Sequence, residues 1–145
     1  MFEKILILCT GNICRSPLAE ALIRDRAHAK GKQILVRSAG IGALVNHAAD
    51  QTTQQVASQH QVDLDTHRAQ QLNLELTRWA DLILGMEKHH LDFTNDLDPT
   101  TRGKTFLLGH WNKAEVPDPY RKPQEAHQLA YEIISEAVDQ WVEKI

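Results

Sequence analysis

The chain has few cysteines, and both lie in one short segment. Cys9 and Cys14 are the only two among 145 residues. A framework of several disulfides is therefore excluded, and so is a zinc site built from cysteine pairs. Chains without such a framework are typical of reducing compartments, so we expect a cytoplasmic protein in which Cys9 stays a free thiol.

Long apolar runs and a strong charge of either sign are also absent. No stretch approaches the roughly 18 consecutive apolar residues of a membrane span, and the first residues lack the apolar core of a signal peptide. A formal net charge of -3 gives no electrostatic footprint for nucleic acid or an anionic membrane. We therefore expect neither nucleic-acid binding nor membrane insertion, and local donors must attract any anionic substrate.

What the chain does contain is an alternation of short apolar runs with helical patterns. The apolar runs lie at residues 5–8, 34–36, 81–84 and 105–108. Between and after them, helical patterns begin at residue 17 and cover about 50–60, 72–79 and 126–145. This alternation predicts an α/β fold, with a three-layer, four-stranded open parallel sheet and helices on both faces. The length predicts one domain over residues 1–145.

The loop after the first predicted strand carries the strongest chemical signal. Between Cys9 and Arg15 it is short, and Ser16-Pro17 marks the start of a helix. Such a loop points backbone N–H groups at a common centre and makes an anion site. The Arg15 guanidinium matches two phosphate oxygens. The same donors stabilise a thiolate, so we expect Cys9 to be a nucleophile. The expected phosphate-binding residues of the loop are Thr10, Gly11, Asn12, Ile13, Cys14 and Ser16.

The spacing between Cys9 and Arg15 is weak evidence when it is taken alone. Many chains contain such a pair by chance, with the cysteine ending a strand and the arginine on the surface. The preceding strand, the following helix start and Gly11 between them favour the phosphate loop.

A second signal is the tripeptide Pro117-Asp118-Pro119. Cleavage of an aryl phosphate expels a phenolate whose conjugate acid has a pKa of about 10, so a proton donor helps the leaving oxygen. A bound phosphate favours the protonated form of a nearby carboxyl group, and two prolines hold Asp118 on a stiff loop. The tripeptide taken alone favours a turn, but beside the phosphate loop at Cys9 we interpret Asp118 as a candidate general acid. The alternative is a surface turn in which Asp118 caps a backbone N–H group.

The segment from Cys9 to Pro17 resembles the signature loop of the low-molecular-weight protein tyrosine phosphatases. The resemblance continues in chain order through Ser38-Ala39-Gly40, His67-Arg68-Ala69, and residues 81–86, 109–111 and 117–121. It implies strand order 2-1-3-4 and hydrolysis of phosphotyrosine through a cysteinyl-phosphate, with Arg15 holding the phosphoryl oxygens. The resemblance further implies a monomer that needs neither metal nor cofactor.

The details look most similar to bacterial members of this family. Those members act opposite tyrosine autokinases of capsule or exopolysaccharide systems, so the expected partner is a tyrosine-phosphorylated autokinase. In the family, residues that match Ser38 and His67 brace the side chain at Asn12. Gln70 stands where many members carry arginine, and we expect it to alter the packing around these braces.

Other expected site residues are open to two interpretations. Leu44 and Tyr120 match positions that line the cleft and are expected to sandwich the substrate ring, although an apolar loop residue such as Leu44 often only packs. Ser16 either donates to the Cys9 thiolate or caps the helix. Cys14 either traps an oxidised Cys9 as a disulfide or is a small buried side chain.

The eight histidines show no spacing of metal ligands. We interpret the pair His89-His90 as solvated helix positions and predict no metal site there.

Two other functions remain open from the sequence. Some arsenate reductases share this loop, but they need further cysteines for a disulfide relay, and this chain has none beyond Cys14. A phosphocysteine carrier or a phosphotyrosine-binding module without turnover would also suit the loop. Asp118 argues against such a module, because a binder has no leaving group to protonate.

Overall fold

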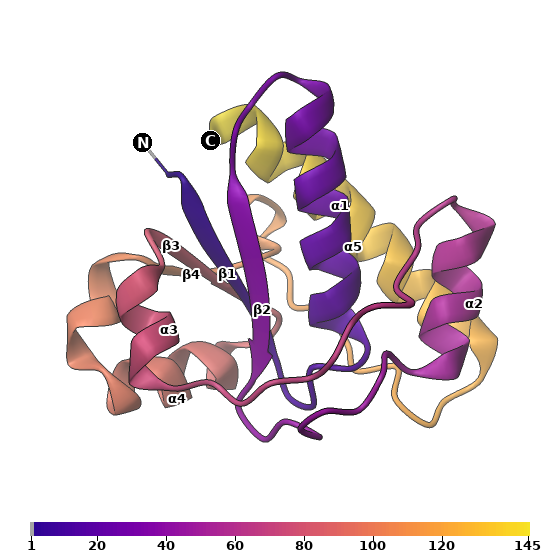
Figure 1. The fold of residues 1–145 in the computed structure, drawn as a ribbon, viewed down its shortest axis with the longest axis horizontal. Helices are drawn as coiled ribbons and strands as arrows, with labels where there is room; N and C mark the ends of the chain where they lie inside the picture. Colours follow the sequence, from indigo (N-terminus) through magenta and orange to yellow (C-terminus); the bar gives the residue numbers. More distant parts are fainter. Residues whose placement is uncertain (1) are drawn as a thin grey trace.

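Four parallel strands form the middle layer of the molecule. In the computed structural model, which describes residues 2–145, they pair in the order β2-β1-β3-β4 (Figure 1). The predicted α/β class and the predicted strand order are both confirmed. The strands are β1 (Lys4–Cys9), β2 (Leu35–Gly40), β3 (Leu82–Gly85) and β4 (Thr105–Leu107).

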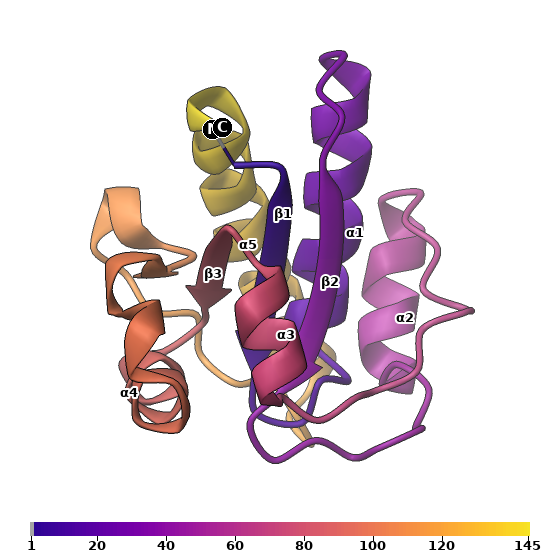
Figure 2. The same ribbon diagram turned by 60° about the vertical axis from the view of Figure 1, so that its left-hand side comes forward.

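Helices cover both faces of this sheet. In Figures 1 and 2, α1 and α5 lie on one face together with α2, while α3 and α4 lie on the other. The helices are α1 (Arg15–Ala29), α2 (Gln51–Gln59), α3 (Leu74–Trp79), α4 (Lys88–Leu97) and α5 (Gln124–Lys144), with the 3-10 turns η1 (Pro99–Gly103) and η2 (His110–Asn112).

The continuous apolar run of β1 follows from this three-layer arrangement. Ile5 and Ile7 pack in one cluster with side chains of α1 and α5, and Leu6 and Leu8 pack in a second cluster with Leu76 of α3. All four β1 side chains are completely buried. A central parallel strand is covered on both faces, so it needs apolar residues at every position rather than at alternate ones.

The sequence prediction gave no bounds for the helix α4, although it interpreted His89-His90 as helix positions. Its two buried residues are His90 and Thr94, which are both polar. Hydrogen bonds satisfy these two polar side chains, and the helix has no apolar stripe. The periodicity that reveals an amphipathic helix is therefore missing. By contrast, α2 follows the expected pattern, and Asp50 caps it by accepting a hydrogen bond from the Thr53 N–H group at 3.1 Å.

The carboxyl ends of β1 and β3 open at the same edge of the sheet. β1 runs into residues 10–14, and β3 runs into Met86 and Glu87. Ligands of open parallel sheets bind at this edge, where chain connections diverge to either side.

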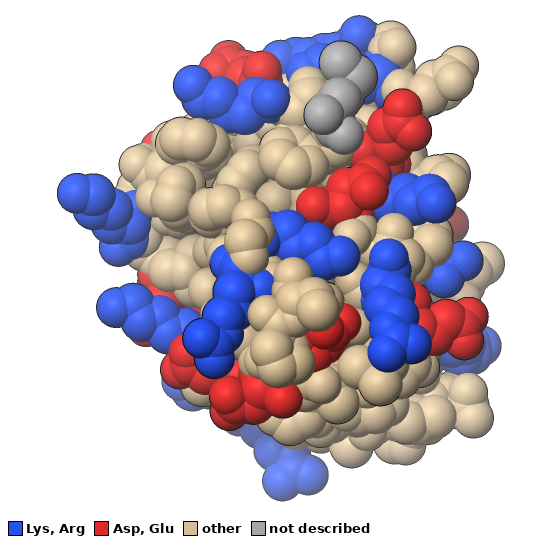
Figure 3. Space-filling model, turned by 90° about the vertical axis from the view of Figure 1, so that its left-hand side faces the viewer, with Lys and Arg blue, Asp and Glu red and all other residues tan. Residues whose placement is uncertain are grey.

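On the face drawn in Figure 3, neither acidic nor basic side chains dominate. Acidic and basic side chains are interspersed over this face, which carries α3 and α4. Such mixing does not produce the basic stripe of a nucleic-acid surface. Among residues 2–145, no helix combines the length and the apolar character needed to cross a bilayer.

Candidate active site

The loop after β1 is turned so that its carbonyl groups face outward. Five consecutive carbonyl oxygens, from Cys9 to Ile13, each accept a hydrogen bond from a segment outside the loop. Their donors are Ile41 N (3.1 Å), Gly42 N (3.0 Å), Leu44 N (3.1 Å), His67 Nε2 (2.6 Å) and Asp50 N (2.8 Å).

The backbone N–H groups of the same loop remain available. Within residues 2–145, none of the N–H groups of residues 11–14 donates a hydrogen bond to another part of the protein. Because the carbonyl groups are held outward, these N–H groups are left for a ligand beside the N-terminus of α1. This arrangement is an anion-binding nest supported by a helix dipole.

The loop turns at Asn12, whose backbone is left-handed. Its φ of 59° lies in the left-handed region, which asparagine tolerates better than most residues. Its side chain is completely buried and makes three hydrogen bonds, to Ser16 Oγ (2.8 Å), to Ser38 Oγ (3.0 Å) and from Gln70 N (2.9 Å). Ser38 therefore contacts the Asn12 side chain as expected, whereas His67 holds the Asn12 backbone oxygen instead.

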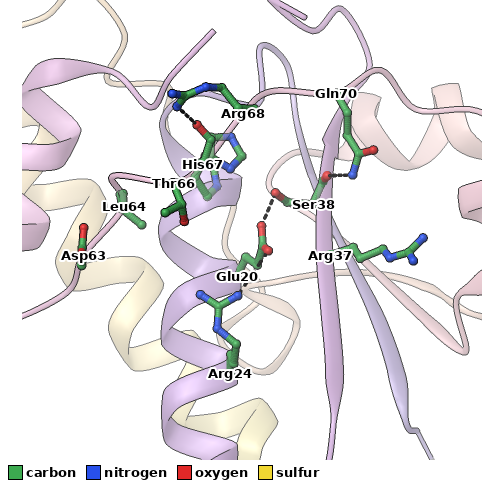
Figure 4. A pocket seen from close by; sticks show the side chains of 11 residues that line it. Glu20, Arg24, Arg37, Ser38, Asp63, Leu64, Thr66, His67, Arg68 and Gln70 are labelled. Carbon is green, nitrogen blue, oxygen red and sulfur yellow. Dashed lines mark hydrogen bonds and ion pairs between the residues drawn. The ribbon is translucent and has the colours of Figure 1, made fainter. Parts of the chain in front are cut away.

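Ser38 is itself fixed from behind the loop. Its hydroxyl group donates to Glu20 Oε1 at 2.5 Å, and its carbonyl oxygen accepts from Gln70 Nε2 at 2.9 Å (Figure 4). Gln70 thus takes part in the bracing through both its backbone and its side chain. These residues line an open hollow of about 480 Å³, and Cys9 is not among the residues that line it.

Cys9 lies at the bottom of a smaller cleft, with its sulfur beside a hydroxyl group. Ser16 Oγ is 2.9 Å from Cys9 Sγ. Because Ser16 Oγ accepts from Asn12, its own proton is free to point at the sulfur. The N-cap position of α1 belongs to Cys14, so the interpretation of Ser16 as a helix cap is wrong.

Arg15 is held rigidly although its charge is almost completely buried. Its side chain is 2% exposed. Nη1 donates to Glu87 Oε2 at 2.6 Å and to the carbonyl oxygen of Val116 at 2.7 Å. The second terminal nitrogen, Nη2, lies 3.5 Å from Thr10 Oγ1 and 3.8 Å from Asp118 Oδ2. One edge of the guanidinium is therefore anchored by protein, while the other is directed at the cleft.

Asp118 faces the same cleft from the opposite wall. Its side chain is 47% exposed, and Oδ1 accepts from the N–H group of Tyr120 at 3.0 Å. The chain leading to it is tied down at Val116, whose N–H group donates to Met86 O at 3.0 Å. The carboxyl group therefore combines a defined position with access to water, as an acid and base group requires. Asp118 also forms the capped turn of the alternative interpretation, because its carboxylate accepts the hydrogen bond from the Tyr120 N–H group.

The cleft has a volume of about 170 Å³, and most of the residues expected at the site line it. Leu44 and Tyr120 pack beside the loop against Ile13, Cys14 and Ala69. The guanidinium carbon of Arg121 lies 5.2 Å from the centre of the Tyr120 ring. The structure brings together, as lining of this cleft, Cys9, Thr10, Gly11, Ile13, Cys14, Arg15, Gly42, Leu44, Asp118 and Tyr120.

The two thiols are in different environments. Cys14 is buried, and the loss of hydration raises the pKa of its thiol from 9.0 to about 12, although a hydrogen bond with Thr53 acts in the opposite direction. Its thiol is therefore protonated at any physiological pH, which disfavours reaction. Cys9 and Cys14 are both free in the structure.

The interpretation of His89-His90 as two solvated positions is wrong for His90. His90 is completely buried, Nδ1 accepts from Glu87 N at 3.0 Å, and Nε2 lies 3.0 Å from Thr10 Oγ1. Glu87, His89 and His90 place potential metal-ligand atoms within 4.8 Å of one another. Both ring nitrogens of His90 and one Glu87 oxygen are, however, already engaged with protein groups.

The contributors to the site that were missed from the sequence include Glu20, Glu87, His90 and the carbonyl group of Val116. Glu87 carries a usable signal, because it follows β3 and therefore emerges at the same edge of the sheet as Cys9. No local pattern marks Val116, which acts through a backbone atom.

Known proteins resemble this chain over its whole length. The family model for low molecular weight phosphotyrosine protein phosphatases matches residues 4–145. The low molecular weight protein-tyrosine-phosphatase Wzb of Escherichia coli K12 is 46% identical over 146 residues, which cover 100% of this chain and 97% of that protein.

Solved structures agree with this assignment. The structure of Vibrio vulnificus Wzb in complex with benzylphosphonate matches with a TM-score of 0.94 at 41% identity, over 100% of both chains. The YwlE arginine phosphatase from Geobacillus stearothermophilus matches with a TM-score of 0.90 at 30% identity, over 98% of this chain and 92% of that one. The chain belongs to the low molecular weight phosphotyrosine protein phosphatases.

Proposed function

We propose that this protein-tyrosine-phosphatase acts through a cysteinyl-phosphate formed at Cys9, with Asp118 first as acid and then as base. One observation carries the proposal. The ring of free N–H groups, the Cys9 sulfur, the free edge of Arg15 and the Asp118 carboxyl group all face one cleft.

In the first step, the Cys9 thiolate attacks phosphorus in line with the bond to the tyrosine oxygen. The S–P bond forms as the P–O bond breaks, and Asp118 gives its proton to the departing phenolate oxygen. Arg15 Nη2 and the loop N–H groups hold the three remaining phosphoryl oxygens as charge shifts among them. The products of this step are tyrosine and a phosphocysteine, with Asp118 left as a carboxylate.

In the second step, water attacks the phosphocysteine. The Asp118 carboxylate takes a proton from this water while the new P–O bond forms and the S–P bond breaks. The Ser16 hydroxyl group, 2.9 Å from Cys9 Sγ, stabilises the departing thiolate. Inorganic phosphate leaves, and the enzyme returns to its starting state.

The substrate class follows from the walls of the cleft. Leu44 and Tyr120 offer an apolar side chain and an aromatic ring above a phosphate site, which suits the flat ring of phosphotyrosine. We propose as physiological partner a bacterial tyrosine autokinase of capsule or exopolysaccharide assembly. Bacterial relatives such as Escherichia coli Wzb support this partner by analogy.

The mechanism is tested by rapid-quench mass spectrometry during hydrolysis of a phosphotyrosine peptide. We expect a transient gain of one phosphate on the peptide that contains Cys9, and Cys9→Ser should show neither the adduct nor turnover. A phosphoarginine peptide run in parallel tests the substrate class. Faster hydrolysis of phosphoarginine would contradict a tyrosine phosphatase while leaving the cysteine chemistry intact.

The partner is tested separately with the Cys9→Ser variant as a substrate trap. The variant is used to capture phosphoproteins from a lysate of the source cell. We expect a tyrosine autokinase that is released by free phosphate, with Cys9→Ser/Arg15→Ala as the matched control that captures none. Capture of other phosphoproteins without an autokinase would contradict this partner.

A further inference from the structure

A closed ring of hydrogen bonds surrounds the anchored edge of Arg15. Arg15 Nη1 donates to the Glu87 carboxylate at 2.6 Å, and the Glu87 N–H group donates to His90 Nδ1 at 3.0 Å. His90 Nε2 lies 3.0 Å from Thr10 Oγ1, which in turn lies 3.5 Å from Arg15 Nη2. The ring therefore links the first turn of α4 to the phosphate loop through side chains.

The contacts of His90 fix where its proton lies. Nδ1 accepts from a backbone N–H group, so it carries no proton of its own. The proton of the neutral ring is consequently on Nε2. The Glu87 carboxylate is 4.0 Å from Nε2, whereas Thr10 Oγ1 is 3.0 Å away, so Nε2 donates to the threonine.

The ring is neutral because of its surroundings. Burial and the nearby Arg15 charge lower the pKa of His90 from 6.5 to about 3. At neutral pH the ring therefore keeps one acceptor and one donor, each with its own partner.

The contacts of the Thr10 hydroxyl group determine the direction in which its proton points. A hydroxyl oxygen has two lone pairs and one proton. Its lone pairs face the two donors, His90 Nε2 and, at longer range, Arg15 Nη2. Thr10 also lines the cleft that contains Cys9. The proton is thus directed away from both donors and is free for an anion in the cleft.

We propose that the Thr10 hydroxyl group donates a hydrogen bond to the phosphoryl group of the substrate, and that His90 is the positioning residue that aims it. This inference rests on the proposed phosphatase mechanism and adds a side-chain donor to its backbone donors. Hydrogen bonds to charged groups are stronger than neutral ones, so loss of this donor lowers kcat/KM about tenfold.

The test is a double-mutant cycle read by kcat/KM for an aryl phosphate. Thr10→Val and His90→Leu should each lower kcat/KM about tenfold, and the double variant should be no worse than either. Thr10→Ser and His90→Gln should stay within about twofold of the wild type. A glutamine amide reproduces the donor and the acceptor of the neutral ring and suits this capping position. The exposed neighbour His89→Gln is the matched control and should leave the rate unchanged.

A binding measurement separates this inference from the mechanism. The dissociation constant of benzylphosphonate, measured by calorimetry, should rise about tenfold in Thr10→Val and not in Thr10→Ser. This binding measurement needs no turnover. It therefore tests the role of Thr10 even if the wild type forms no phosphocysteine. Unchanged binding in Thr10→Val, or losses in the double variant that multiply to about a hundredfold, would overturn the inference.

A spectroscopic readout covers the case in which His90→Leu does not fold. Nitrogen-15 NMR of labelled histidine should show a His90 proton on Nε2 in the wild type, with a shifted Nε2 resonance in Thr10→Val. A proton on Nδ1, or an unmoved Nε2 resonance, would contradict the positioning role.

Discussion

Arg15 Nη1 and Glu87 Oε2 are 2.6 Å apart, and this ion pair joins the start of α1 to the N-cap of α4. Arg15 is 2% exposed and Glu87 is 26% exposed. A charge buried to this extent is costly when it lacks a partner. The pair therefore keeps the arginine charged, oriented and close to the cleft.

We expect Glu87→Ala to lower the free energy of unfolding by about 3 kcal/mol, because it leaves the Arg15 charge without its carboxylate. The activity should fall by at least about tenfold, since the guanidinium loses one of its two anchors. Glu87→Gln retains an acceptor and should be milder on both measures. Urea unfolding and kcat/KM check the prediction, with the exposed Glu136→Gln on α5 as control. A Glu87→Gln variant as stable and as active as the wild type would show that the carboxylate charge is irrelevant.

Asp118→Asn should lower the rate by about 10²–10⁴ for aryl phosphates with poor leaving groups, because the amide cannot protonate the phenolate. Esters with acidic leaving groups need less protonation and should lose less. The measurement is kcat/KM over a series of substituted phenyl phosphates. The general-acid role is excluded when the loss is the same across the whole series.

Asn12→Ala should be less stable than Asn12→Gly by about 1 kcal/mol. Both variants lose the side-chain hydrogen bonds, but only glycine takes up the φ of 59° without strain. Both should bind inorganic phosphate about tenfold more weakly, because the loop is no longer braced. Chemical denaturation and phosphate titration measure the two effects. Equal stability of the two variants would mean that the left-handed backbone carries no strain.

His90 should make the fold sensitive to acid. Its pKa is lowered from 6.5 to about 3, so below pH 6.5 the unfolded ring binds a proton that the folded ring does not. The free energy of unfolding should therefore fall as the pH decreases from 6.5 toward 3, by up to about 1.4 kcal/mol per pH unit. Denaturation between pH 7 and 5 should show a smaller slope in His90→Gln. The exposed neighbour His89→Gln should keep the wild-type slope, and equal slopes in all three proteins would contradict the assignment.

Alkylation should distinguish the two thiols. Burial raises the pKa of Cys14 to about 12, so its thiol stays protonated, whereas Cys9 lies among donors that stabilise a thiolate. One equivalent of iodoacetate at pH 7 should label Cys9 in the native protein, and inorganic phosphate should protect it. Peptide mapping identifies the labelled site. Faster labelling of Cys14 would contradict the proposed environments.

The strand order was implied by the family resemblance, whereas the sequence patterns alone were sufficient for the strands and for the residues that follow β1. These features depend on local patterns, such as the buried run of β1 and the loop between Cys9 and Arg15. The helical pattern expected at about residues 50–60 is also present, as α2 (Gln51–Gln59). Patterns of this kind are visible because each residue's role depends on its near neighbours in the chain.

The supporting contacts of the site were not predictable in the same way. His90 was interpreted as solvated, because a buried histidine that contacts a nearby backbone N–H group and the distant Thr10 has no signature in its own segment. Gln70 was expected only to disturb the braces, yet it is one of them. Val116 contributes a carbonyl oxygen, which is independent of residue type. Such roles follow from which segments meet in space.

The outward-facing carbonyl groups of the phosphate loop have a consequence for the unfolded chain. Their donors come from residues 41–67, so a chain that has lost its tertiary contacts also loses the ring of N–H groups around the sulfur. Thiol labelling that phosphate suppresses would then report whether the segment that follows β2 has docked on the loop. The enzyme carries, at its ninth residue, an internal reporter of its own folding.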